Sequence, residues 1–248
     1  MIDRVVRLLK SSLYAMALTG AGISTESGIP DYRSKGLGLW EKYNPAEAAS
    51  ISSLMSNPKS FFNFNIPRWS KYLDVKPNIN HRVLAALEKA GYIQGVITQN
   101  IDNLHFKAGS KNLFEVHGHL RTASCINCGE RYNFTEIVQQ FSNGVNPPIC
   151  NKCKALVRPD VVLFGDPMCD DYYRALEQVK RCDLLIVAGS SLQVYPVAQL
   201  PLYSQKFVII NKESTPLDEK AEIVIHDTAG KVFKAIAEKL DIDFNNIL

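Results

Sequence analysis

The chain lacks an apolar run long enough to cross a bilayer, and it contains no internal repeats or low-complexity tracts. Its first residues lack the uninterrupted apolar segment and small-residue cleavage site of a secretory signal. The net charge of only +3 argues against direct binding to nucleic acid or to an acidic membrane surface. We therefore expect a cytoplasmic protein without membrane association, in which thiols stay reduced.

At 248 residues the chain is long enough to bury a sizeable core, and strand-like and helical segments alternate along it. Near-continuous apolar strands separated by amphipathic helices predict an α/β fold: a Rossmann-like parallel sheet with helices on both faces. The predicted helices are Ile2–Ser11, Asn80–Gly91, Asp171–Lys180, Val197–Ser204 and Gly230–Leu240. The predicted strands are Leu13–Thr19, Gly95–Thr98, Phe114–Val116, Val161–Phe164, Leu184–Ala188, Phe207–Ile210 and Ile223–Ile225.

The first predicted strand leads into a glycine-rich turn with the sequence TGAGISTESGIPDYR, residues 19–33. Gly20 and Gly22 allow close backbone approach, and the N–H groups of such a turn commonly face a diphosphate. The sixth position of the fingerprint is Thr25 where dinucleotide-binding folds have Gly or Ala, and no acid-terminated second strand follows. The turn alone is thus a weak signal and fits poorly with an ordinary hydride-transferring enzyme.

Four of the six cysteines form two C-x2-C pairs, and the pairs are separated by 21 residues. Two such pairs in a reduced compartment favour one tetrahedral zinc site over redox dithiols. A complete set of four sulfurs leaves no open coordination position, so the zinc is expected to be structural. The predicted ligands are Cys125, Cys128, Cys150 and Cys153.

Polar side chains follow several predicted strands, at the edge where parallel sheets bind ligands. Gln99, Asn100 and Asp102 follow one strand; they are either turn residues or groups that recognise a carboxamide and ribose hydroxyls. His117 follows the next strand and is the best general-base candidate of five histidines, although a lone histidine is more often structural. We prefer structural roles for the other four.

Taken together, these segments resemble the sirtuins, the NAD-dependent protein deacylases. The resemblance extends over nearly the whole chain, with the segments in the family's order. The matching segments are GAGIST (20–25), SGIPDYR (27–33), TQNID (98–102), HG (117–118), the four cysteines, VVLFGD (161–166), GSSLQVYP (189–196) and Asn211.

The resemblance implies a protein lysine deacetylase that consumes NAD and releases nicotinamide, O-acetyl-ADP-ribose and deacylated lysine. His117 is implied as the base on a ribose hydroxyl, and Asn100 and Asp102 orient the reacting ribose. The implied NAD-binding residues are Gly20, Ala21, Gly22, Ser24, Thr25, Ile29, Asp31, Tyr32, Arg33, Gln99, Asn100, Ile101, Asp102, Gly189, Ser190, Ser191, Asn211, Lys212 and Ala229.

An acetyl-lysine peptide is the implied partner, pairing as a strand with residues on the other side of the site. Asp166 replaces a common Glu at this edge, and Tyr32 replaces a common Phe. Members that remove succinyl groups carry a Tyr and an Arg three residues later; the corresponding residues here are Asn65 and Arg68, so we predict an acetyl preference. The implied peptide-binding residues are Val162, Phe164, Gly165, Asp166, Val194 and Tyr195.

The resemblance also implies a discontinuous NAD-binding domain formed by residues 1–33, 78–120 and 159–248. Residues 34–77 are expected to form a cofactor-binding loop and the helical part of a small domain, and residues 121–158 its zinc-binding module. Three alternatives stay open: a mono-ADP-ribosyltransferase, a deacylase of longer or acidic acyl groups, and a zinc-ribbon binding module on an idle Rossmann domain. The mixed charges around the cysteines do not favour the last.

Overall fold

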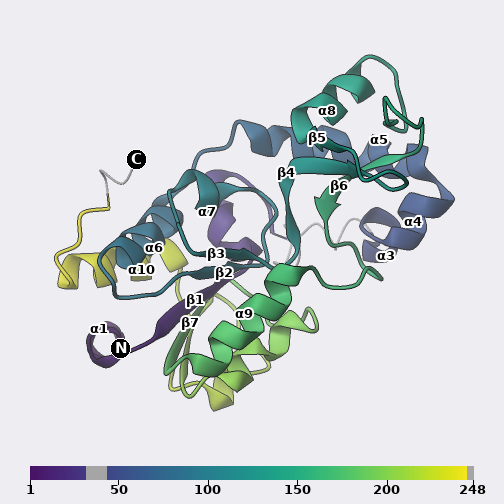
Figure 1. Ribbon diagram of the computed structural model, residues 1–248. Coiled ribbons are helices and arrows are strands. Elements are labelled where there is room, and N and C mark those ends of the chain that lie inside the picture. The colour runs from purple at the N-terminus through teal and green to yellow at the C-terminus, as the bar shows by residue number, and fades with distance from the viewer. Residues whose placement is uncertain (32–43, 245–248) are drawn as a thin grey trace.

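The computed structural model describes residues 1–31 and 44–244, which form a larger and a smaller unit joined side by side (Figure 1). The larger unit contains a six-stranded, wholly parallel sheet in the order β3-β2-β1-β7-β8-β9. This confirms the predicted α/β fold. The strands are β1 (Ala15–Thr19), β2 (Val96–Thr98), β3 (Leu113–Glu115), β7 (Leu184–Ala188), β8 (Phe207–Ile210) and β9 (Ile223–Ile225).

Both faces of the parallel sheet are covered by helices, which explains why its strands are almost continuously apolar. Along β7, Leu184 and Ile186 pack with the core beneath one layer of helices, whereas Leu185 and Val187 pack on the opposite face. The first layer consists of α1 (Ile2–Ser11), α6 (Ile79–Lys89) and α10 (Ala229–Lys239). The second consists of α9 (Asp170–Arg181) and the 3-10 helix η3 (Val197–Tyr203).

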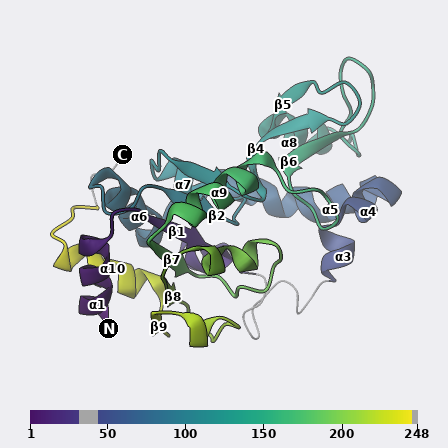
Figure 2. The same ribbon diagram turned by 60° about the horizontal axis from the view of Figure 1, so that its bottom comes forward.

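The smaller unit combines a three-stranded antiparallel sheet, in the order β5-β4-β6, with a group of helices (Figure 2). Its helices are α3 (Pro45–Ala48), α4 (Ile51–Ser56), α5 (Pro58–Trp69), η2 (Ser70–Leu73) and α8 (Phe134–Ser142), and its strands are β4 (Gly118–Cys125), β5 (Arg131–Asn133) and β6 (Val157–Val161).

One aromatic core joins the helical segment of the smaller unit to the cysteine-bearing segment. The rings of Phe61 and Phe62 meet edge to face with centroids 5.5 Å apart, and Trp69 lies 5.9 Å from Phe61. The same cluster contains Phe134 and Ile137 of α8. Buried aromatic side chains contribute strongly to the stability of a protein core. Because both segments supply side chains to this shared core, they stabilise each other.

The structure corrects two sequence-based expectations. Val161–Phe164 is not a strand of the parallel sheet; β6 ends at Val161 in the antiparallel sheet, and the following residues form an extended edge. There the backbone N–H of Phe164 donates to Ala49 O (2.8 Å), so the apolar run packs outside the parallel sheet. The helix predicted at Val197–Ser204 forms as a 3-10 helix over Val197–Tyr203, with Pro201 inside it.

The remaining described helices are short: η1 (Ala21–Ser27) follows β1, α7 (Leu104–Lys107) follows β2, and η4 (Asp218–Lys220) precedes β9. Among the described residues, none of the helices is both long and apolar enough to span a membrane. The strand order reverses direction at β1 and β7. In open parallel sheets this reversal leaves a crevice beyond the carboxyl ends of the two strands, where ligands bind.

Candidate functional site

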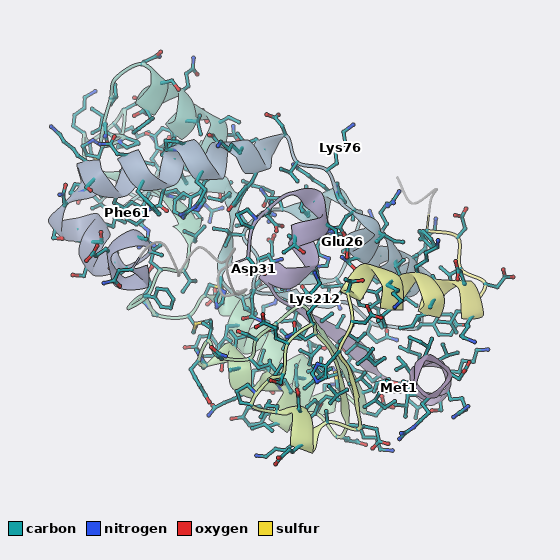
Figure 3. The ribbon with its side chains drawn as sticks, turned by 180° about the vertical axis from the view of Figure 1, so that it is seen from behind. Met1, Glu26, Asp31, Phe61, Lys76 and Lys212 are labelled. Atoms are coloured by element: carbon teal, nitrogen blue, oxygen red, sulfur yellow. The ribbon has the colours of Figure 1, made fainter. Side chains whose placement is uncertain are left out.

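A cleft of about 610 Å³ opens at this reversal point, between the two units. Figure 3 shows Glu26, Asp31 and Lys212 near one another close to the junction, with Phe61 farther out in the smaller unit. Most of the residues singled out from the sequence line this one cleft. They are Gly20, Ala21, Gly22, Thr25, Ile29, Asp31, Gln99, Asn100, Ile101, His117, Val162, Phe164, Gly165, Asp166, Gly189, Ser190, Ser191, Val194, Tyr195, Asn211, Lys212 and Ala229.

Two of the predicted NAD-binding residues that the structure describes do not line the cleft. Ser24 and Asp102 lie beneath it, almost completely buried. Tyr32 and Arg33 fall outside the described residues, as does most of the loop that was expected to cover the cofactor.

The floor of the cleft is formed by the ends of β1 and β7, which touch because of glycine. A Cβ on Gly20 would lie 2.7 Å from Gly189 O, and one on Gly189 would lie 2.5 Å from Ile23 N. Gly189 also has φ = +60°, a conformation that side chains disfavour. The N–H of Gly22 donates to Gly189 O (2.9 Å), so the two turns form one continuous backbone surface. Such a surface suits close contact with a phosphate chain.

His117 lines the cleft, and one of its ring nitrogens is hydrogen-bonded to the backbone. Its Nδ1 lies 3.0 Å from Gln99 O, and a carbonyl oxygen can only accept, so Nδ1 carries the proton. The Nε2 atom is therefore left with a lone pair. Burial lowers the pKa of His117, although the hydrogen bond to Gln99 opposes part of this effect. The imidazole is neutral at neutral pH, as a general base must be.

A buried set of hydrogen bonds lies under the cleft and holds Asn100. Its amide Nδ2 donates to Gly20 O and to Ser24 Oγ, both at 3.1 Å. The Ser24 hydroxyl in turn donates to Asp102 Oδ2 (2.7 Å), and Asp102 Oδ1 accepts from Leu104 N (2.9 Å). Burial raises the pKa of Asp102, and these two donors oppose the rise. Ser24 and Asp102 thus orient Asn100 without reaching the cleft.

Two histidines form a second buried layer beneath this set. His81 Nε2 lies 3.4 Å from Ser24 Oγ, and the rings of His81 and His105 stand 4.9 Å apart, edge to face. His105 Nε2 is 2.9 Å from Thr19 Oγ1. Burial lowers the pKa of His81 well below its usual range and that of His105 to about 3. Both rings are neutral, in keeping with the structural roles preferred from the sequence.

Several residues that line the cleft were not among the site residues predicted from the sequence. Trp69 lies at the end of α5, and tertiary packing brings it to the cleft. Arg68 was singled out only through its place beside Asn65. The others include Glu26, Gly28, Pro30, Ala49, Leu163, Met168, Pro196, Glu213 and Asp227.

The cleft also exposes two aromatic side chains. Phe164 is 43% exposed and Tyr195 is 68% exposed. They come from residues 161–166 and 189–196, two segments that line the same cleft. Exposed aromatic rings beside a cleft are typical of a surface that binds another molecule.

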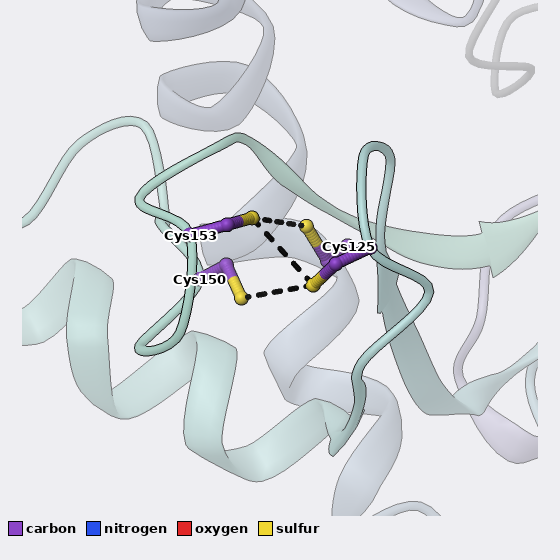
Figure 4. A group of neighbouring side chains, drawn as sticks. Cys125, Cys150 and Cys153 are labelled. Carbon is purple, nitrogen blue, oxygen red and sulfur yellow. Dashed lines mark hydrogen bonds between the residues drawn. The ribbon is translucent and has the colours of Figure 1, made fainter.

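The four cysteine sulfurs of the smaller unit form a compact cluster (Figure 4). Four sulfurs around a zinc ion, each about 2.3 Å away, lie about 3.8 Å apart if the geometry is tetrahedral. The Cys125–Cys153 and Cys128–Cys150 sulfur pairs are 3.4 and 3.6 Å apart, and all four lie within 4.8 Å of one another. All six cysteines are free, so the cluster contains no disulfide. The donor set fits the expected structural zinc.

Tyr132 of β5 connects this cluster to the protein around it. Its hydroxyl donates to Cys150 Sγ (3.2 Å) and accepts from Asn151 N (2.9 Å). The hydrogen bond from Tyr132 is the main reason that the pKa of the Cys150 thiol falls to about 6, which favours the thiolate that zinc requires.

We predict that Tyr132→Phe weakens zinc retention by about 10- to 100-fold, the usual effect of losing a hydrogen bond to a metal ligand. Competition with a chromogenic chelator measures this directly. Tyr173→Phe, an exposed tyrosine of α9, is the matched control and should behave as wild type. Equal zinc retention in Tyr132→Phe and the control would contradict this role.

The buried histidines predict acid-sensitive stability. In the unfolded chain both side chains have a pKa near 6.5, whereas burial in the folded state lowers both pKa values. As the pH falls, the unfolded state therefore binds more protons than the folded state. Each histidine should therefore cost about 2 kcal/mol of folding free energy between pH 7 and pH 5. The raised pKa of Asp102 offsets part of this loss, since the folded state then binds the extra proton.

Urea unfolding at the two pH values measures the effect. The variant His105→Asn should show a shallower dependence than wild type, because one of the two depressed groups is removed. An identical pH dependence would show that His105 is not the group that titrates on unfolding.

Residues 20–196 match the model of the Sir2 family. NAD-dependent protein deacetylase 2 of Caldanaerobacter subterraneus is 48% identical over 236 residues, which is 95% of this chain and 94% of that protein. NAD-dependent protein deacylase 2 of Archaeoglobus fulgidus is 42% identical, with 96% of each chain covered.

Solved structures are similar over the same length. One is a Sir2 protein with a deacetylated peptide and 3'-O-acetyl ADP ribose; its TM-score is 0.93 at 36% identity, covering 98% of this chain and 99% of that one. Another is a Sir2 complex with a peptide and NAD+; its TM-score is 0.91 at 36% identity, covering 97% and 99% of the two chains. The chain with this glycine-floored cleft and four-sulfur cluster belongs to the Sir2 family.

Proposed function

We propose that the protein is an NAD-dependent protein lysine deacetylase that transfers the acetyl group to ADP-ribose. The observation that carries this function is the position of His117: a neutral imidazole with an available Nε2, between a glycine-floored dinucleotide crevice and an exposed peptide edge. The names and bound ligands of the relatives support the same reaction. NAD is consumed as a substrate, and the products are deacylated lysine, nicotinamide and O-acetyl-ADP-ribose.

The glycine floor is the proposed diphosphate site. Gly20, Ala21 and Gly22 present backbone at the cleft, and Ser190 stands opposite them at the end of β7. Gln99 crosses from the end of β2 and donates from Nε2 to Ser190 Oγ (2.9 Å), which ties the two sides together. Asn211, Lys212 and Ala229 lie at the end of the cleft formed by β8 and α10 and would face the adenosine half. Thr25, Ile29, Asp31, Ser191, Tyr32 and Arg33 are proposed to complete the NAD site.

Asn100 and Ile101 are proposed to line the nicotinamide pocket. The buried bonds to Gly20 and Ser24 hold the Asn100 amide in one orientation, so little conformational entropy remains to be lost when the ligand binds. Ser24 and Asp102 act as positioning residues for it. Preorganised polar groups in a dry pocket stabilise developing charge far more than flexible groups in water.

His117 is the proposed base. When bound, NAD supplies the ribose carbon that accepts the acyl oxygen as nicotinamide leaves. Nε2 of His117 would then take the proton of a ribose hydroxyl, while Nδ1 stays bonded to Gln99 O. Val162, Phe164 and Gly165 on one side of the cleft, and Val194 and Tyr195 on the other, would hold the acetyl-lysine peptide.

The zinc site has a structural role in this proposal. We propose one NAD-binding domain made of residues 1–33, 78–120 and 159–248, and a small domain made of residues 34–77 and the zinc-binding module 121–158. Four free thiols at a zinc site suit a reducing compartment, which supports a cytoplasmic location.

His117→Ala tests the proposed reaction. With an acetyl-lysine peptide and NAD, wild type should remove the acetyl mass and form O-acetyl-ADP-ribose, and the variant should be slower by about 10²- to 10⁴-fold, the usual contribution of a general base. Mass spectrometry follows both products, and calorimetry checks that the variant still binds NAD. A peptide that gains the mass of ADP-ribose would instead favour the mono-ADP-ribosyltransferase.

A second candidate activity, removal of acyl groups that end in a carboxylate, is favoured by Arg68. This guanidinium lines the cleft, and its Nε and Nη1 are buried without a hydrogen-bond partner among the described residues. Nη2 donates to Asn65 Oδ1 (2.7 Å). The Asn65 amide donates to Ala48 O and Phe61 O. Of these two side chains, Arg68 is therefore the one with N–H groups left for a ligand. A carboxylate is the usual partner of two such N–H groups.

Comparing succinyl-lysine and acetyl-lysine peptides tests this second candidate. Replacing Arg68 by Met should lower the ratio of succinyl to acetyl turnover by about 10-fold or more, since a hydrogen bond to a charged group contributes roughly 1.5–3 kcal/mol. Arg131→Met, an exposed arginine of β5, serves as the control. If Arg68→Met leaves the ratio of succinyl to acetyl turnover unchanged, Arg68 does not recognise an acyl carboxylate and the acetyl preference stands.

A further inference from the structure

Residues 162–166 form the edge proposed to bind the peptide, and their backbone is held from both sides. The N–H of Val162 donates to His117 O (2.8 Å), and Phe164 exchanges backbone hydrogen bonds with Ala49 O (2.8 Å) and Ile51 N (3.0 Å). The edge therefore touches both the residue of the proposed base and the helical part of the smaller unit. A small displacement of this edge would move the acyl-lysine relative to His117.

The carboxylate of Asp166, a residue that lines the cleft, is hydrogen-bonded to this edge and to Arg158. Oδ2 accepts from Leu163 N (2.9 Å), while Asp166 N donates to Leu163 O (3.0 Å). Both carboxylate oxygens also accept from Arg158: Nη1 to Oδ1 at 3.1 Å and Nη2 to Oδ2 at 2.6 Å. The pair is shielded, since only 18% of the Arg158 side chain and 13% of the Asp166 side chain are exposed.

Arg158 links this edge to the cysteine cluster. It lies in β6, opposite Ser124 of β4, and the neighbouring pair in the register is Val157 with the zinc ligand Cys125. Both cysteine turns hold the start of β6, because Ile126 N donates to Leu156 O (3.0 Å) and Cys150 N donates to Ala155 O (2.7 Å). Arg158 Nη2 also donates to Val161 O at the end of the strand (2.8 Å).

We propose that Arg158 is a positioning and specificity-determining residue for the peptide, an inference that rests on the proposed deacetylase function. Its bidentate bond holds Asp166 in the turn that shapes the edge, and its charge neutralises the carboxylate so that the edge does not select basic peptides. The fork of two parallel N–H···O bonds supplies direction as well as charge, which a lysine does not reproduce. The zinc module thereby sets the geometry of peptide binding through β6.

Steady-state kinetics of Arg158→Met test the proposal with two acetyl-lysine peptides, one with Arg and one with Glu beside the acetyl-lysine. The KM for peptide should rise about 10-fold or more, while the Kd for NAD stays at the wild-type value. Wild type should treat the two peptides alike, and the variant should favour the Arg peptide because Asp166 is left with an unpaired charge. Adding Asp166→Asn should abolish that preference.

Arg131→Met is the matched control from the same sheet and should leave all these constants unchanged. Arg158→Lys provides a variant that keeps the charge, so it should raise the KM for peptide without creating a charge preference. If Arg158→Met does not fold, the peptide KM of Arg158→Lys tests the positioning role instead.

Unchanged peptide KM values in the folded variants would overturn the proposal, as would equal losses of NAD and peptide binding. A wild-type enzyme that deacetylates neither peptide would instead refute the proposed function itself, so the two failures are distinguishable.

Discussion

The contact between the ends of β1 and β7 is the constraint on which the rest of the site depends. Gly20 and Gly189 approach so closely that a Cβ on either would collide with backbone of the other turn. This contact creates the floor of the cleft and lets Gln99 reach across β1 to Ser190. Gln99 O then accepts from His117, so the orientation of the proposed base follows from the packing of two glycine turns.

Below this floor, polar groups are buried and almost fully paired, and this pairing gives the cleft its rigidity. Asn100, Ser24 and Asp102 form a chain of hydrogen bonds, and the neutral rings of His81 and His105 close it from beneath. Burying such groups is costly unless each finds a partner, so a partly satisfied network would destabilise the fold. The arrangement is consistent with a site that must exclude water and hold a ligand in one pose.

Much of this organisation could be predicted from the sequence, but not the contacts across units. Continuous apolar strands revealed the parallel sheet, and the cysteine spacing revealed the zinc cluster, because both signals are local. The run Val161–Phe164 was misassigned because a branched apolar segment satisfies the pattern of a buried strand wherever it packs. The positions of Arg68 and Trp69 at the cleft, and the Arg158–Asp166 pair, arise from tertiary packing. Local sequence carries no signal for such pairs, and resemblance to a family supplied the role of His117.

The central claim is that NAD cleavage and lysine deacylation are one coupled reaction in this cleft. The most direct test measures the ratio of nicotinamide released to acetyl-lysine lost with peptide present, and the rate of nicotinamide release when peptide is omitted. Coupled chemistry predicts a ratio of one and very little nicotinamide release when peptide is omitted, since the acyl oxygen is then missing. Nicotinamide release at the same rate without peptide would contradict this coupling, because it would show that the cleft hydrolyses NAD independently of any acyl-lysine.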